Sequence, residues 1–162
     1  MFKILKYSLI AIICQNAAFA QISDKDIAAS INEYYLANVA MIKKQDDEAY
    51  AHLKKAAKLD PTNSTFINSA GYMAMHLGEL ETSLKYLERA LALDTEKFGE
   101  THPNVASILN NMGSVYSKMG DSKKAVDYYD QAYVIISEFL GQKHPQVVNV
   151  KRIRDEEAAK IN

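Results

Sequence analysis

Apolar residues in the middle of the chain recur at steps of three and four, in two runs separated by a single glycine. The first run consists of Phe66, Ile67, Ala70, Met73, Ala74 and Leu77, and the second of Leu80, Leu84, Leu87, Ala90, Leu91 and Leu93. Steps of three and four place side chains on one face of an α-helix. Gly78 lies between the runs and suits the left-handed backbone that ends a helix. The pattern therefore predicts a helical hairpin.

The same hairpin pattern appears again further along the chain, at a constant offset. Gly71 corresponds to Gly113, Gly78 to Gly120, Ala90 to Ala132 and Gly99 to Gly141, each pair 42 residues apart by subtraction. In the second copy Asp121 follows the turn glycine and is a good N-cap for the next helix. Repeats of 20–50 residues are typical of stacked units that bury a continuous core and present a binding surface.

The three prolines and an earlier, degenerate unit extend the array. Pro61 and Pro103 each stand 17 residues before a turn glycine, and Pro145 occupies the matching start of a terminal segment. Since proline suits the first turn of a helix, we expect each to open one. Counting back predicts a first hairpin with its turn at 44–45, opened by a capping box of Ser23 and Asp26.

The N-terminal residues have the pattern of a secretory signal peptide. Lys3 and Lys6 precede an apolar run over 8–14, and Ala18 and Ala20 fit the small-residue cleavage pattern. We expect residues 1–20 to be removed after Ala20 and the protein to be periplasmic or secreted. The run is short for a membrane span, although an uncleaved anchor stays open. Ile13 before Cys14 argues against lipidation.

Removal of this leader changes the charge and the cysteine content. It takes away two lysines and the single cysteine, so 17 basic residues face 20 acidic ones, a net charge of −3 with no disulfide. Nothing in this balance favours nucleic acid. The four histidines are scattered, so no metal site is expected, and no phosphate loop, dinucleotide fingerprint or nucleophile motif predicts a cofactor or an enzyme.

Taken together, these units resemble tetratricopeptide repeats. We place three repeats at about 30–63, 64–97 and 106–139, with a capping helix over 145–161, in one domain of residues 21–162. The spacers 95–102 and 137–144 carry Gly-x-x-His-Pro and are similar to the 42-residue repeats of kinesin light chains and their bacterial relatives. The resemblance implies an all-α, right-handed α-solenoid whose first helices line a concave groove for extended peptides or partner helices. Two positions depart from the family pattern: the first unit has no turn glycine, and Ser83 replaces the usual alanine.

Positions on the first helices predict which residues face the groove. The candidates share uncharged side chains, and they are Tyr34, Asn38, Asn68, Tyr72, Met75, Asn110, Asn111 and Ser114. An asparagine amide can both donate to and accept from a peptide backbone, and kinesin light chain grooves resemble this one in using an asparagine row. Alternatively, the asparagines only tolerate solvent and the tyrosines pack neighbouring helices. The basic clamp of chaperone-binding relatives is missing, because only Lys118 is available.

Three functions are open at this stage. The first is a scaffold that binds a protein or peptide partner in its groove, without cofactor, nucleic acid or membrane span. The second is a self-assembling homo-oligomer in which another copy fills the groove. The third and weakest is an enzyme with a site built from His76, Glu79 and Lys118. The sequence does not identify the partner or the pathway, and it leaves open whether the terminal helix caps the stack or binds a partner.

Overall fold

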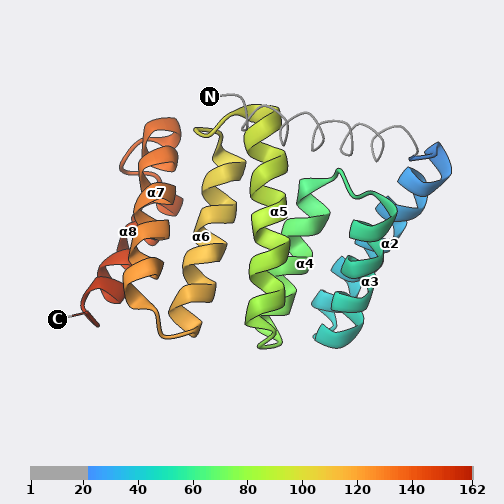
Figure 1. The fold of residues 1–162 in the computed structure, drawn as a ribbon, viewed down its shortest axis with the longest axis horizontal. Helices are drawn as coiled ribbons and strands as arrows, with labels where there is room; N and C mark the ends of the chain where they lie inside the picture. Colours follow the sequence, from blue (N-terminus) through green and yellow to red (C-terminus); the bar gives the residue numbers. More distant parts are fainter. Residues whose placement is uncertain (1–21, 162) are drawn as a thin grey trace, which may run out of the picture.

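The computed structural model describes residues 22–161, and within this range the chain forms seven α-helices and no strand (Figure 1). The helices are α2 (Asp24–Ile42), α3 (Asp46–Leu59), α4 (Ser64–His76), α5 (Leu80–Phe98), α6 (Pro103–Lys118), α7 (Ser122–Leu140) and α8 (Pro145–Ala158). The predicted signal peptide lies outside the described residues. The predicted all-α class is confirmed.

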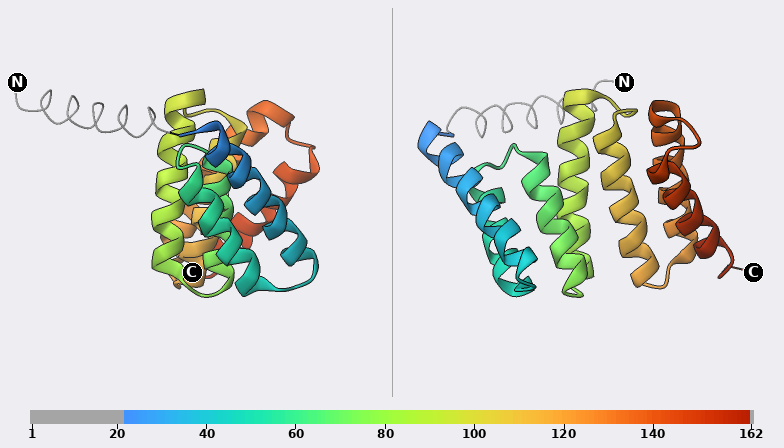
Figure 2. Two further views of the ribbon diagram at one scale, coloured as in Figure 1. Left: turned by 90° about the vertical axis from the view of Figure 1, so that its right-hand side faces the viewer. Right: turned by 180° about the vertical axis from the view of Figure 1, so that it is seen from behind.

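The helices pair into hairpins that stand side by side (Figures 1 and 2). Helices α2 and α3, α4 and α5, and α6 and α7 make the most extensive contacts, and α3 to α4 and α5 to α6 join successive hairpins. Helix α8 packs on α7 at the end of the row. This is the predicted solenoid of three hairpins followed by a terminal helix.

The turn inside each hairpin has one residue with left-handed backbone conformation at the corresponding position, whether or not that residue is glycine. Gly78 and Gly120 have φ of 82° and 81°. The next amide closes each turn: Glu79 N donates to Ala74 O at 2.8 Å, and Asp121 N donates to Tyr116 O at 3.0 Å. In the first hairpin Lys44 has a φ of 59°, which confirms the predicted turn there. A side chain in this conformation is strained.

Histidine and proline together open the helices that follow the two spacers. Pro103 and Pro145 are the first residues of α6 and α8, as predicted. The side chain of His102 accepts from the amide of Asn104 at 3.2 Å, and His144 does the same for Gln146 at 3.3 Å. The two histidines are therefore helix caps, a role that the sequence did not suggest.

The expectation for Pro61 was wrong, because α4 begins three residues later. Asn63 is the N-cap, and its side-chain oxygen accepts from the amides of Thr65 and Phe66. Pro61 lies in the preceding turn, where the Asp60 carboxylate accepts from Thr62 N at 3.1 Å. The local hydrogen bonds of Asp60 and Asn63 thus fix the helix start.

Small residues allow the paired helices to approach closely. A Cβ atom on Gly113 would lie 2.7 Å from the Tyr129 ring, and one on Gly71 would lie 3.0 Å from Leu87. The exceptional Ser83 is completely buried, and its hydroxyl donates to Gly71 O at 2.7 Å. Serine therefore fits where alanine is usual, because the hydroxyl finds a partner.

The spacers mainly lengthen the second helices. Helices α5 and α7 each have 19 residues, whereas α3 has 14. Only four residues remain between Phe98 and Pro103, and Gly99 there has a φ of 88°. The added turn carries Lys97 and Phe98 in one repeat, and Phe139 and Leu140 in the next.

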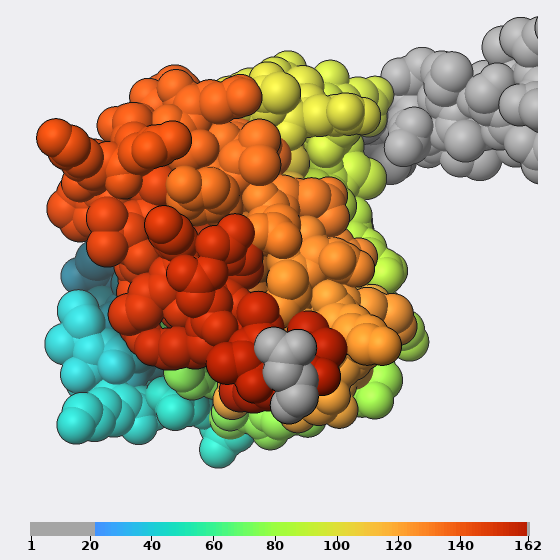
Figure 3. Space-filling view, turned by 90° about the vertical axis from the view of Figure 1, so that its left-hand side faces the viewer, coloured from blue at the N-terminus to red at the C-terminus, as the bar shows by residue number. Residues whose placement is uncertain are grey.

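Helix α8 covers one end of the stack (Figure 3). Val147 and Val150 join the apolar cluster between α6 and α7. Glu157, near the other end of α8, is also buried, and its carboxylate accepts from Ser117 at 2.7 Å, Ser122 at 2.6 Å and Lys160 at 2.6 Å. Burial alone would raise the pKa of Glu157, but these hydrogen bonds outweigh it and hold the pKa below 4.5. The terminal helix is thus anchored by apolar contacts at its start and by a carboxylate at its end.

Candidate partner-binding surface

Direct contacts connect the first helices of successive hairpins. The rings of Tyr34 on α2 and Phe66 on α4 are 4.9 Å apart. On α4 and α6, Asn111 Nδ2 donates to Asn68 Oδ1 at 3.0 Å. Helix α6 reaches α8 through the bond from Ser117 to Glu157. Helices α2, α4, α6 and α8 therefore form one layer, and we call the outer surface of α2, α4 and α6 the first-helix face.

Most of the predicted groove residues already have partners within the protein. Asn38 Nδ2 donates to Tyr34 O at 2.8 Å, within one turn of α2. Ser114 donates to Asn110 O at 3.0 Å and accepts from Tyr129 at 3.1 Å. These internal hydrogen bonds give Asn38 and Ser114 a structural role, and a ligand can use only the donors and acceptors that the bonds leave over.

Tyr72 is the most accessible aromatic residue among the candidates. Its side chain is 40% exposed, and its ring lies 4.6 Å from that of His76. It stands four residues after Asn68, which places both on the same side of α4. The first-helix face therefore brings together an exposed aromatic ring and the amide pair of Asn68 and Asn111. Binding by these residues stays a prediction.

Met75 does not lie on this face, so its assignment to the groove was wrong. It is only 5% exposed and belongs to the cluster that contains Ala56, Ile108 and Met112. Helical periodicity placed it near Tyr72, but the periodicity does not reveal which neighbouring helix covers a given position.

A charged cluster joins α2 to α3 on the first hairpin. Glu33 is buried, and it accepts from Lys55 and is bonded to His52 Nδ1 at 2.7 Å. The hydrogen bond from Lys55, followed by that from His52, lowers the pKa of Glu33 below 4.5. This cluster satisfies the buried carboxylate and holds the first hairpin closed.

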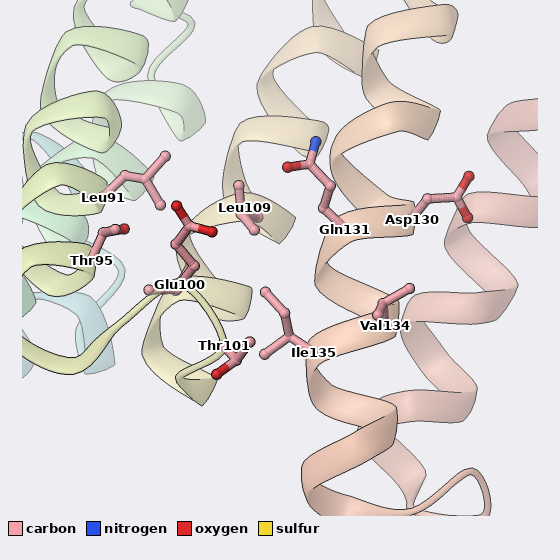
Figure 4. Close-up of a pocket in the computed structure, with 10 residues that line it drawn as sticks. Leu91, Thr95, Glu100, Thr101, Leu109, Asp130, Gln131, Val134 and Ile135 are labelled. Atoms are coloured by element: carbon pink, nitrogen blue, oxygen red, sulfur yellow. The ribbon is translucent and has the colours of Figure 1, made fainter.

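One hollow lies on the side of the second helices (Figure 4). It has a volume of about 620 Å³, and Leu91 of α5 and Ile135 of α7 stand on opposite sides of it. Glu100, Thr101 and Asp130 add polar groups to its lining. Asp130 already accepts from Arg154 at 2.8 Å, so its charge is partly neutralised.

Two further hollows occupy corresponding places in successive repeats. The terminal hollow, about 450 Å³, lies between α6, α7 and α8, and its lining includes Ala106, Asn110, Ile136, Phe139, Leu140 and Val150. The central hollow, about 570 Å³, lies one repeat earlier, and its lining includes Ser64, Thr65, Asp94, Lys97, Phe98 and Asn104. The sequence prediction missed both hollows. Comparing residues at the 42-residue offset would have shown that their linings differ.

The groups named for an enzymatic site do not gather in one place. Tyr50 donates to Glu79 at 3.0 Å, whereas His76 packs on Tyr72. Lys118 is exposed at the end of α6. Over residues 22–161, no three His, Cys, Asp or Glu side chains are grouped so that they could hold a metal ion. In the same range, every helix is too short or too polar to cross a membrane.

Known proteins resemble the chain in sequence and in fold. Two models described as "Tetratricopeptide repeat" match residues 61–138 and 34–63. No curated protein matches the chain. The N-terminal domain of stress-induced protein-1 from C. elegans is similar in structure, with a TM-score of 0.63 and 24% identity over 80% of this chain and 98% of that one.

Two other solved structures add to this likeness. Kinesin light chain TPR-like repeats from Podosopora anserina have a TM-score of 0.69 and 16% identity, over 78% of this chain and 64% of that one. The first TPR of Spaghetti (RPAP3), solved with the HSP90 peptide SRMEEVD, has a TM-score of 0.64 and 14% identity, over 82% and 95%. At these identities the likeness concerns the fold.

Proposed function

Since the chain belongs to the tetratricopeptide repeat family, we propose that it is a scaffold that binds a partner peptide or helix on its first-helix face. This family is typically made of non-enzymatic proteins that mediate protein interactions. One observation carries the proposal: the exposed Tyr72 stands beside the amide pair of Asn68 and Asn111. An aromatic ring provides apolar contact area, and amides can pair with the backbone of a bound chain.

The chemistry of this face favours an uncharged ligand. The peptide bound to the first TPR of Spaghetti has the sequence SRMEEVD, and three of its last four residues are acidic. Among the described residues of α2, α4 and α6, the Lys and Arg side chains are Lys25 in the first turn of α2 and Lys118 at the far end of α6. A single exposed lysine provides little stabilisation for a group of carboxylates. We therefore infer a partner segment that binds through backbone hydrogen bonds and apolar side chains.

We further propose that the protein works outside the cytoplasm. Lys3, Lys6, the apolar run and the alanines at 18 and 20 support export followed by cleavage after Ala20. N-terminal sequencing of the protein recovered from the cell envelope and the medium tests this. A first residue of Gln21 supports it, and an intact N-terminus in the cytoplasm refutes it.

The test of partner binding is an in-cell crosslinking pull-down with matched variants. The binding variant is Tyr72→Ala combined with Asn111→Ala, and the control is Val134→Ala, an exposed residue on α7 at the other layer. Circular dichroism and urea unfolding establish that each variant folds. A partner that the wild type and the control retain, and that the binding variant loses, supports the proposal.

Two outcomes argue against it. If the binding variant and the control recover the same partner equally well, the first-helix face is not the binding surface. If only the protein itself is recovered, and its mass in solution rises with concentration, the chain is a self-assembling subunit.

A further inference from the structure

The asparagine pairing between first helices stops at the last hairpin. Asn68 of α4 is paired with Asn111 of α6. The residue that corresponds to Asn68 one repeat later is Asn110, and the residue that corresponds to Asn111 is Ile153 on α8. An isoleucine side chain has no donor, so α8 cannot repeat the bond that α6 makes.

Asn110 is left with an unsatisfied acceptor as a result. Its Oδ1 is buried, and among the described residues it is the one buried side-chain polar atom without a hydrogen-bond partner. Buried polar atoms in proteins are nearly always paired. Asn110 also lines the terminal hollow, and the torsion that orients its amide is broad and easily turned. Because the oxygen is buried, the amide has to turn before a donor in the hollow can bond to it.

At three corresponding positions, the lining of the terminal hollow has an apolar residue where the central hollow has a polar or charged one. At the 42-residue offset, Ala106 replaces Ser64, Ile136 replaces Asp94 and Phe139 replaces Lys97. In the central hollow, Ser64 and Asp94 are bonded to each other. The terminal hollow has no charged residue in its lining, and Phe139 at its border is 66% exposed. An exposed ring beside an uncharged hollow favours an apolar occupant.

From these observations we propose that the terminal hollow is the anchoring site for one aliphatic or aromatic side chain of the partner peptide. The adjacent backbone N–H of the peptide donates to Asn110 Oδ1, in the place that the asparagine of a next repeat would otherwise occupy. The inference rests on the proposed function, because it locates one contact of the same bound segment. It also explains why the asparagine pairing stops where an uncharged hollow begins.

The first test is NMR with the full chain and a small probe, N-acetyl-L-leucine methylamide, which combines an aliphatic side chain with backbone N–H groups. We expect saturable shifts of the Asn110 side-chain amide and of the Ile136 and Val150 methyl groups. The analogue N-acetyl-L-glutamic acid methylamide, which carries a charge, should bind about tenfold more weakly, since its carboxylate would lose water in an uncharged hollow.

Two variants separate the parts of the site. Phe139→Lys introduces the residue of the central hollow at an exposed position, and Ile153→Asn supplies the missing donor to Asn110. Each should weaken probe binding up to about tenfold, as expected for the loss of one apolar contact or one hydrogen bond. The matched control is Lys97→Phe, which places a ring at the central hollow and should not create binding there, because Asp60, Asp94 and Glu96 keep carboxylates in its lining.

Several outcomes would overturn the inference. Shifts confined to Tyr72 and Asn111 would leave the proposed function standing and reject the terminal hollow. The absence of saturable shifts up to the solubility limit would also reject it, while the crosslinking experiment decides the proposed function separately. If the NMR signals of the hollow residues shift with protein concentration in the absence of the probe, the hollow binds a second copy of the chain. Unchanged binding in Ile153→Asn would reject the role of Asn110.

Discussion

Replacing Gly113 by alanine tests whether the helix crossing in the third hairpin is as tight as the structure indicates. The new Cβ would lie 2.7 Å from Cδ1 and Cε1 of the Tyr129 ring. That ring is 2% exposed, and its hydroxyl donates to Ser114 at 3.1 Å. The ring therefore cannot move aside without disturbing both its packing and its hydrogen bond.

The expected change in stability is the sum of one stabilising and two destabilising contributions. Alanine favours the helix over glycine by about 1 kcal/mol. Overpacking a tight core destabilises by about 1–3 kcal/mol, and a lost hydrogen bond adds about 0.5–1.5 kcal/mol. We expect Gly113→Ala to lower the free energy of unfolding by roughly 1–3 kcal/mol.

Gly71→Ala is the matched control at the corresponding crossing. Its nearest neighbours would be Leu87 Cδ2 and Cγ at 3.0 Å and Tyr86 Cβ at 3.1 Å, so the neighbours need a smaller shift than at Gly113. Here the helix propensity offsets most of the strain, and we expect a change within about 1 kcal/mol. The assay is urea unfolding followed by far-UV circular dichroism.

The reasoning fails if Gly113→Ala is as stable as the wild type, or if Gly71→Ala is the more harmful of the two. A double-mutant cycle with Tyr129→Leu adds a second criterion. If the ring causes the strain, the two changes should be clearly non-additive.

Two further predictions concern the first turn and the buried carboxylates. Lys44→Gly should raise the free energy of unfolding by about 0.5–1 kcal/mol, because glycine adopts the left-handed conformation without strain, and urea unfolding measures this. Glu33 and Glu157 have folded pKa values below 4.5, so their stabilisation is complete above that pH and is lost as the pH falls below it. The urea concentration at the unfolding midpoint should therefore decrease as the pH is lowered below about 4.5. The variant Glu157→Gln should be less stable than the wild type at neutral pH but should lose less stability on acidification. Equal losses of stability in both proteins would contradict the assignment.

Local patterns in the sequence were enough to predict the hairpins. Gly78 and Gly120 mark turns through their own backbone preferences, and the apolar steps around them define helices without reference to distant residues. Even the turn at Lys44 follows from counting back 17 residues from Pro61, because the repeat imposes a conformation that lysine alone would avoid. These features depend on residues close together in the chain.

Features that depend on which helix covers which residue were not predictable in the same way. Met75 shares a helix with Tyr72, but it is buried in a cluster that includes residues of other helices. Pro61 fits a helix start by its offset, yet the side chain of Asn63 begins the helix instead. The unpaired oxygen of Asn110 follows from Ile153, more than 40 positions further along, so one helix has to be placed against another before the deficit is visible.

The contacts between helices join almost entirely neighbours in the chain, and this has a consequence for how the molecule folds. Each hairpin can form from its own residues and then serve as a surface on which the next one condenses, so no long loop has to close first. Helix α8, like α2 at the other end, has one extensive neighbour, so the two terminal helices are the first expected to detach. The hollow beside Asn110 is therefore built only once the final helix has docked, so a partner held there would favour the completed stack over one with a frayed end.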